Sequence, residues 1–179
     1  MSYSVSVYAV DLFLLRSVLD NPHHPARGTL NADVGTAEGR ALSALLGGPR
    51  PKGLTAADLA YALERLCDRL GRRVGSNGLS GIRSAFLEGA YRVIDPVYAP
   101  TGFSLQRLVE GGPPVALPPP DDFPAVGFVE NDVVARAHAF TEAESPTLED
   151  PDLDQVLVDL AEWLAVAASR GWGLVAFYA

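Results

Sequence analysis

Two serines come closest to the pattern of a catalytic nucleophile. A nucleophile elbow places the serine of Gly-x-Ser-x-Gly on a tight turn between a strand and a helix. The segments that start at Gly78 and Gly102 each have a serine two residues later, Ser80 and Ser104, but neither has the second glycine in position. We therefore expect Ser80 to cap a helix rather than to attack a substrate.

A glycine repeat precedes the helix that is expected after residue 81. Gly75, Gly78 and Gly81 recur every three residues, and backbone N–H groups at such a helix start can hold a phosphate. The spacing matches neither the dinucleotide-binding fingerprint nor the Walker loop, and no lysine lies nearby. The repeat therefore favours a structural turn over a phosphate site.

The cysteine and histidine content predicts no metal site and no cofactor. The chain has one cysteine, Cys67, and three histidines, whereas a structural zinc site takes four such ligands. His23 and His24 are adjacent, so on an extended segment they point in opposite directions. They are expected to be solvated loop residues. His138 lies between two alanines on an expected helix, which favours an interface or surface position.

The strongest signal is a charge split along the chain. Residues 1–100 carry 11 Lys or Arg and 9 Asp or Glu, a formal charge of +2, whereas residues 101–179 carry 3 Arg and 13 Asp or Glu, a formal charge of −10. No lysine or arginine lies between Ala137 and Ser169. Such an acidic surface can steer a basic protein partner toward it. The predicted partner-binding residues are the carboxylates of this stretch: Glu142, Glu144, Glu149, Asp150, Asp152 and Asp154.

The same carboxylates admit other interpretations. Asp152 or Asp154 could cap the following helix while the remaining carboxylates keep the protein soluble. Residues 149–154 could bind Ca²⁺ loosely, although they lack the glycine and the terminal glutamate of an EF-hand loop.

Composition excludes several classes of function. A net charge of −8 argues against nucleic-acid binding and against docking on anionic lipid. No apolar run is long enough for a transmembrane helix, and no signal peptide is evident at the start of the chain. Leu63, Leu66 and Leu70 surround Cys67 and predict a buried thiol, which fits a reducing, cytoplasmic compartment. The basic residues are 13 Arg and one Lys, a bias typical of a GC-rich bacterial genome.

The elements that position these residues are strands at both ends and helices between them. Residues 2–10 alternate as a half-buried strand, and residues 172–179 form a strand too apolar for an exposed edge. Helices are expected over 12–20, 37–46, 56–70, 82–94, from a cap at Asn131 or Asp132 to Phe140, and over 153–170, with a short strand at 123–129. The proline triplet at 118–120 is expected to be locally extended. We predict one α+β domain over 1–179, with one small mixed sheet that contains both terminal strands, packed against several helices.

Both ends and one middle segment resemble a known family. The residues are Tyr8-Ala9-Val10-Asp11 before a leucine-rich helix, Asp122-Phe123-Pro124-Ala125-Val126-Gly127, and residues 171–178 after a helix. They are similar to the YfbM-like proteins and their relatives, bacterial families of unknown function. The resemblance implies a single α+β domain and transfers no catalytic residue.

Three classes of function remain open. We predict a protein-binding module, for example an immunity or antitoxin-type protein that docks a basic partner. The alternative is a small hydrolase-type enzyme with surface-cleft carboxylates as general acid and base. A third hypothesis is a self-associating domain with Trp163 or Trp172 at a homodimer contact. A deep pocket with two or more carboxylates would favour the enzyme, and a flat acidic surface with an exposed aromatic would favour docking.

Overall fold

A four-stranded sheet lies at the centre of the protein. The structure, a computed structural model, describes residues 4–30, 35–75, 84–120 and 123–179. The sheet has the order β2-β1-β4-β3 and is built from β1 (Val5–Val10), β2 (Arg72–Gly75), β3 (Ala125–Val129) and β4 (Gly173–Tyr178). The predicted pairing of the terminal strands is confirmed, because Val5 pairs with Tyr178 and Val10 with Gly173.

The three strand pairs are all antiparallel, whereas a mixed sheet was expected. The connection between β3 and β4 explains one of these pairs. It consists of two helices, α6 (Asn131–Glu144) and α7 (Pro151–Ala168), which run in opposite directions. They return the chain to the end of the sheet where β3 finished, so β4 must run antiparallel to β3.

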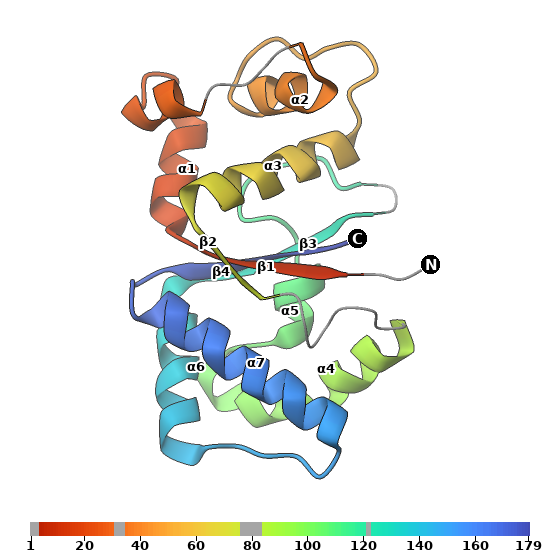
Figure 1. Cartoon of the computed structure of the whole chain (residues 1–179), viewed down its shortest axis with the longest axis vertical. Helices are drawn as coiled ribbons and strands as arrows, with labels where there is room; N and C mark the ends of the chain where they lie inside the picture. Colours follow the sequence, from red (N-terminus) through yellow and green to blue (C-terminus); the bar gives the residue numbers. More distant parts are fainter. Residues whose placement is uncertain (1–3, 31–34, 76–83, 121–122) are drawn as a thin grey trace.

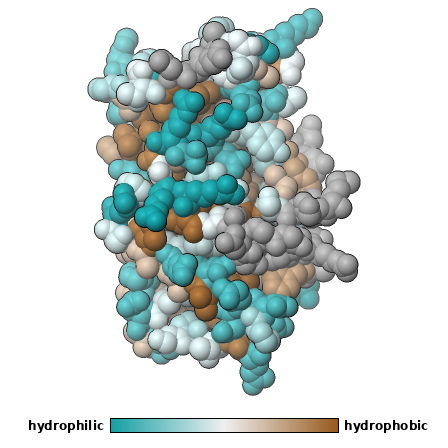
Figure 2. Space-filling view, in the orientation of Figure 1, coloured by the Kyte–Doolittle hydropathy of each residue, from teal (hydrophilic) through white to brown (hydrophobic). Residues whose placement is uncertain are grey.

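Helices cover both faces of the sheet (Figure 1). One layer contains α1 (Leu12–Asp20), α2 (Ala37–Leu45) and α3 (Ala56–Leu70), with the short 3₁₀ helix η1 (Pro25–Thr29). The other contains α4 (Ser84–Tyr98), η2 (Ala99–Thr101), α5 (Leu105–Glu110), α6 and α7. The acidic stretch lies in the second layer, with α6 and α7, and this layer also contains α4 from the first 100 residues. On the face shown in Figure 2, hydrophilic residues are intermixed with separate apolar areas.

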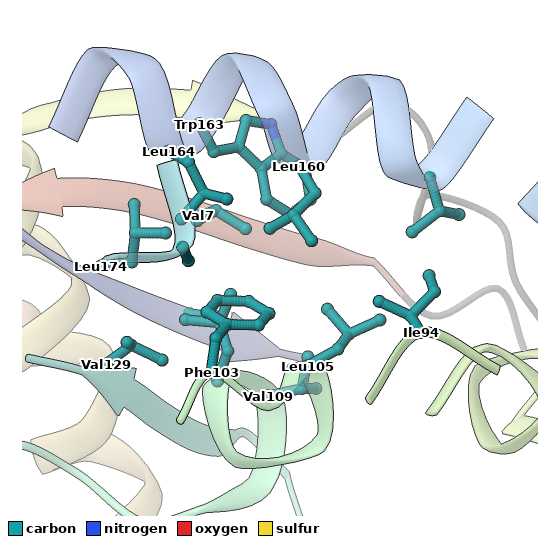
Figure 3. Packing of buried hydrophobic residues seen from close by; sticks show 14 of the residues in the cluster. Val7, Ile94, Phe103, Leu105, Val109, Val129, Leu160, Trp163, Leu164 and Leu174 are labelled. Carbon is teal, nitrogen blue, oxygen red and sulfur yellow. The ribbon is translucent and has the colours of Figure 1, made fainter. Parts of the chain in front are cut away.

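The sheet separates two hydrophobic cores. Val7 and Leu174 belong to the core under α7, whereas Tyr8 and Val175 belong to the core under α3, as the two-residue period of a strand requires. In Figure 3, Trp163 and two leucines of α7 point toward the strands. Because both faces are covered, β1 is buried on both sides rather than half-buried, and all six residues of β4 are buried as expected.

The predicted helix starts of the first layer are confirmed. Asp11, Thr36 and Thr55 cap α1, α2 and α3, each with a side-chain oxygen that accepts from a backbone N–H in the first turn. At α3, Asp58 also accepts from the backbone N–H of Thr55, which completes a capping box. The bounds of α3 coincide with the predicted 56–70, and Gly71 follows its end.

Other boundaries differ from the prediction. The helix α4 continues past Asp95-Pro96 to Tyr98. Proline inside a helix lowers stability by about 3 kcal/mol. Tyr98 is 0% exposed, and the burial of its side chain offsets a cost of that order. The predicted start of this helix, at residue 82, and the glycine repeat from Gly78 lie outside the described residues. The helix α6 begins at Asn131 and runs to Glu144, and its N-cap residue, Glu130, makes no side-chain capping bond.

Candidate functional site

The six predicted partner-binding carboxylates lie at the connection between α6 and α7. We call residues 142–154 the acidic turn. It comprises the end of α6, the residues 145–150 between the helices, and the first turn of α7. Ser145 ends α6 in the left-handed conformation, with φ 43°. Hydrophilic residues project from this end of the molecule (Figure 2).

Five of the six carboxylates are exposed and the sixth is half-buried. Glu142 and Glu144 stand on the last turn of α6, Glu149 lies between the helices, and Asp152 is in the first turn of α7. Asp150 is also exposed, whereas Asp154 is half-buried. The structure therefore brings together on one turn all six residues that the sequence singled out.

Two of these carboxylates hold the turn in shape. Asp150 is the N-cap of α7, and its Oδ1 accepts hydrogen bonds from the backbone N–H groups of Asp152 (3.0 Å) and Leu153 (3.3 Å). The Oδ1 of Asp154 accepts from the backbone N–H of Leu148 at 2.9 Å. The expectation that Asp152 or Asp154 caps α7 is wrong, because Pro151 occupies the first helical position, which puts the cap one residue before it.

No basic side chain compensates the acidic turn within the described residues. The described residues form the ion pairs Arg16–Glu130, Arg65–Glu38, Arg92–Glu88 and Arg136–Asp132. All four lie outside the acidic turn. The first turn of α7 gives Asp152 and Asp154 a favourable interaction with the helix dipole, but the charges of the turn otherwise face solvent.

One of the two tryptophans of the self-association hypothesis is buried in the core and the other is half-buried. Trp163 is 2% exposed and belongs to the core under α7, so it is not available for a homodimer contact. Trp172 is half-buried, and the guanidinium carbon of Arg170 lies 4.8 Å from its ring centroid. Trp172 follows the C-terminal end of α7. An 18-residue helix spans roughly 27 Å, so Trp172 lies far from the acidic turn.

A second candidate site lies between α2 and α3, in the opposite layer. This α2–α3 pocket has a volume of about 400 Å³. Its lining residues come from both helices: Ala37, Glu38, Ala41, Asp58, Tyr61, Ala62, Glu64 and Arg65. No motif in the sequence predicted this pocket. The recurrence of Asp58, Tyr61, Glu64 and Arg65 at helical spacing on α3 was the available signal.

Each carboxylate of the α2–α3 pocket already has a partner in the protein. Glu38 contacts Arg65 at 2.6 Å, and Glu64 accepts a hydrogen bond from the Tyr8 hydroxyl at 3.1 Å. Asp58 accepts from the backbone and the hydroxyl of Thr55, both at 2.8 Å. These hydrogen bonds lower the pKa of Asp58 below its ordinary value.

This arrangement is suited to binding rather than to acid–base catalysis. A carboxyl group that acts as a general acid at neutral pH must have a pKa raised toward that pH. The pKa of Asp58 is instead lowered. Among the described residues that line the pocket, none is a serine, cysteine or histidine that could act as a nucleophile or base. Within the described residues, no group of three or more His, Cys, Asp or Glu side chains is placed to hold a metal ion.

The remaining sequence candidates have structural roles. Ser104 caps α5, and its hydroxyl donates to Asp95 at 2.7 Å. His24 caps η1 by accepting from the backbone N–H of Ala26 at 3.2 Å. His138 is half-buried on α6, and the thiol of Cys67 is buried as predicted. Ser80 lies outside the described residues.

The comparison with protein families gives one match. The model of the family described as Domain of unknown function (DUF7691) matches residues 1–179. No curated protein and no solved structure matches the chain. The expected domain of unknown function is thus confirmed, and the more specific resemblance to YfbM-like proteins stays a prediction. No helix in the described part of the chain combines the length and apolar character that a bilayer crossing needs.

Proposed function

This chain belongs to the DUF7691 family, and we propose that it is a protein-binding module that docks a basic protein surface through the acidic turn. The observation that carries the proposal is the concentration of exposed carboxylates on one turn without a basic side chain to compensate them in the described residues. A surface of this kind raises the encounter rate with a basic partner, because long-range attraction acts before contact.

The shape of the turn supports docking. The charges are carried by the ends of two helices, α6 and α7, which pack against each other. The hydrogen bonds of Asp150 and Asp154 fix the segment between them. A partner that binds here would therefore find charges already in position, which reduces the ordering cost of association.

An immunity or antitoxin-type protein is one concrete form of this function. Such a protein neutralises a basic toxin, so both partners need complementary charge and rapid association. A bacterial, cytoplasmic setting is part of the proposal, in keeping with the arginine-rich composition and the single buried thiol.

The hydrolase-type alternative rests on the α2–α3 pocket, which does contain three carboxylates. We rank it second because all three already have protein partners and the described lining offers no nucleophile beside them.

The test compares two variants that remove the same charge. E144Q/E149Q/D152N neutralises three exposed carboxylates of the acidic turn and leaves the Asp150 and Asp154 hydrogen bonds intact. The matched control, D20N/D68N/E88Q, neutralises three exposed carboxylates elsewhere. Immobilised wild-type protein is used to capture a partner from the native host. The association rate of the purified partner is then measured against all three proteins at low and high salt.

We expect a basic partner whose association with wild-type protein slows steeply as salt rises. The turn variant should associate more slowly and with a flatter salt dependence, and the control should resemble wild type. If the turn variant and the control behave alike, or if no basic partner binds, the acidic turn serves solubility only.

A further inference from the structure

We propose that the α2–α3 pocket binds a small organic cation that carries primary amine or guanidinium groups. The pocket lies in the layer opposite the acidic turn (Figure 1). The inference is therefore independent of the proposed docking function.

Small side chains contribute to the hollow. Ala37 and Ala41 of α2 and Ala62 of α3 belong to its lining, and side chains of this size leave space between two packed helices. The resulting volume of about 400 Å³ lies in the range of sites that hold small molecules. A concave site of this size fits a metabolite better than a flat protein surface.

The pocket offers hydrogen-bond acceptors. Glu38, Asp58 and Glu64 each use one carboxylate oxygen in the contacts described above. Their second oxygens, Oε1 of Glu38, Oδ1 of Asp58 and Oε2 of Glu64, make no hydrogen bond within the described residues. Ammonium and guanidinium groups carry only donors, so they match these free acceptors.

The charge and the aromatic ring also select a cation. The described lining residues include three carboxylates and one guanidinium, so their net charge is negative. Tyr61 is 45% exposed beside these carboxylates, and a tyrosine ring face attracts ammonium and guanidinium groups. An aliphatic spacer between two cationic groups would contact the alanines of the lining.

The Glu38–Arg65 ion pair does not close the pocket. The two side chains are 62% and 51% exposed, respectively, and an exposed pair of this kind contributes little stability. A ligand cation can therefore share or replace Arg65 as the partner of Glu38.

The test uses ligands of matched length and different charge. Wild-type protein is titrated by calorimetry and by NMR with putrescine, agmatine and spermidine at low salt. The uncharged control is 1,4-butanediol, which has the same carbon chain as putrescine, and the anionic control is succinate. We expect saturable binding of the amines and none of either control.

Variants then locate the site. E38Q/E64Q should weaken amine binding by about tenfold or more, since it removes two charge-assisted contacts. Y61L should weaken it less, and E88Q, in the opposite layer, should leave it unchanged. Thermal unfolding of each variant checks the fold, and because Glu38 and Tyr61 are exposed, E38Q and Y61L give the answer even if E64Q unfolds.

The proposal is overturned if no amine binds at millimolar concentration, if butanediol or succinate binds equally well, or if the pocket variants and E88Q bind amines alike. Because none of these measurements involves the acidic turn, their failure would leave the docking function standing.

Discussion

Gly75, the last residue of β2, lies directly beneath the indole of Trp163. A β-carbon at Gly75 would overlap the ring at Nε1, and Trp163 is 2% exposed in the core under α7. The edge strand can therefore approach α7 only because residue 75 has no side chain. This contact joins β2, a strand of four residues, to α7, a helix of 18 residues that lies far from it in the sequence.

The first prediction concerns this contact. Gly75→Ala should lower the free energy of unfolding by about 1–3 kcal/mol, because the new methyl group meets a packed ring. Gly89→Ala is the matched control, since nothing lies within 4 Å of a β-carbon there and alanine is favoured in a helix. Urea unfolding of both variants checks the difference. An unchanged midpoint for Gly75→Ala would show that the ring moves freely.

The second prediction concerns the start of α5. Asp95, in α4, accepts from the backbone N–H of Leu105 at 2.5 Å and from the Ser104 hydroxyl at 2.7 Å. Asp95→Ala should destabilise the protein by about 1–3 kcal/mol, because it leaves two donors without their acceptor. Asp20→Ala, at an exposed carboxylate in the last turn of α1, should change stability little. Equal unfolding midpoints for the two variants would contradict the role of Asp95.

The third prediction separates the cap of α7 from its neighbour. Asp150→Ala should lower stability by about 1 kcal/mol, because the side chain accepts two backbone N–H bonds at the N-cap. Asp152→Ala should cost only a few tenths of a kcal/mol, through the helix dipole. Thermal unfolding compares the two. The reverse order would mean that Asp152 is the cap.

The fourth prediction is a loss of stability at alkaline pH. Burial comes first, followed by the negative charge of Glu64 and Glu110, which accept hydrogen bonds from the hydroxyls of Tyr8 and Tyr91, respectively. Both raise the pKa of these tyrosines above the ordinary 10.0. A group whose pKa is raised on folding stabilises the protein below the unfolded value, and this contribution is lost as pH rises above about 10. Urea unfolding at pH 8 and at about pH 11 should show a smaller loss for Y8F/Y91F than for wild type. An equal loss would assign the alkaline effect to other groups.

The fifth prediction concerns the single thiol. Cys67 is 0% exposed on α3, and burial raises its pKa. Native protein should therefore not react with a disulfide reagent on the timescale of minutes, whereas unfolded protein should react at once. The reaction is followed by absorbance with and without denaturant. Rapid reaction of the native protein would mean that α3 opens readily.

The sequence by itself determined the elements that depend on neighbouring residues. Asp11, Thr36 and Thr55 precede apolar helical patterns, so the starts of α1, α2 and α3 follow from bonds within one turn. The pairing of β1 with β4 followed from burial, since residues 173–178 are too apolar to remain without a neighbour on either side. The exposure of the acidic stretch followed from the cost of burying unpaired charges.

The tertiary structure decided the features that depend on contacts between distant segments. β2 exists because the free edge of β1 accepts Arg72 and Arg73, and no pattern in four residues indicates this. α4 continues through Pro96 because Tyr98 is buried against Phe103 and Phe140. The α2–α3 pocket depends on how closely two helices pack, and short-range sequence patterns carry no information about that distance.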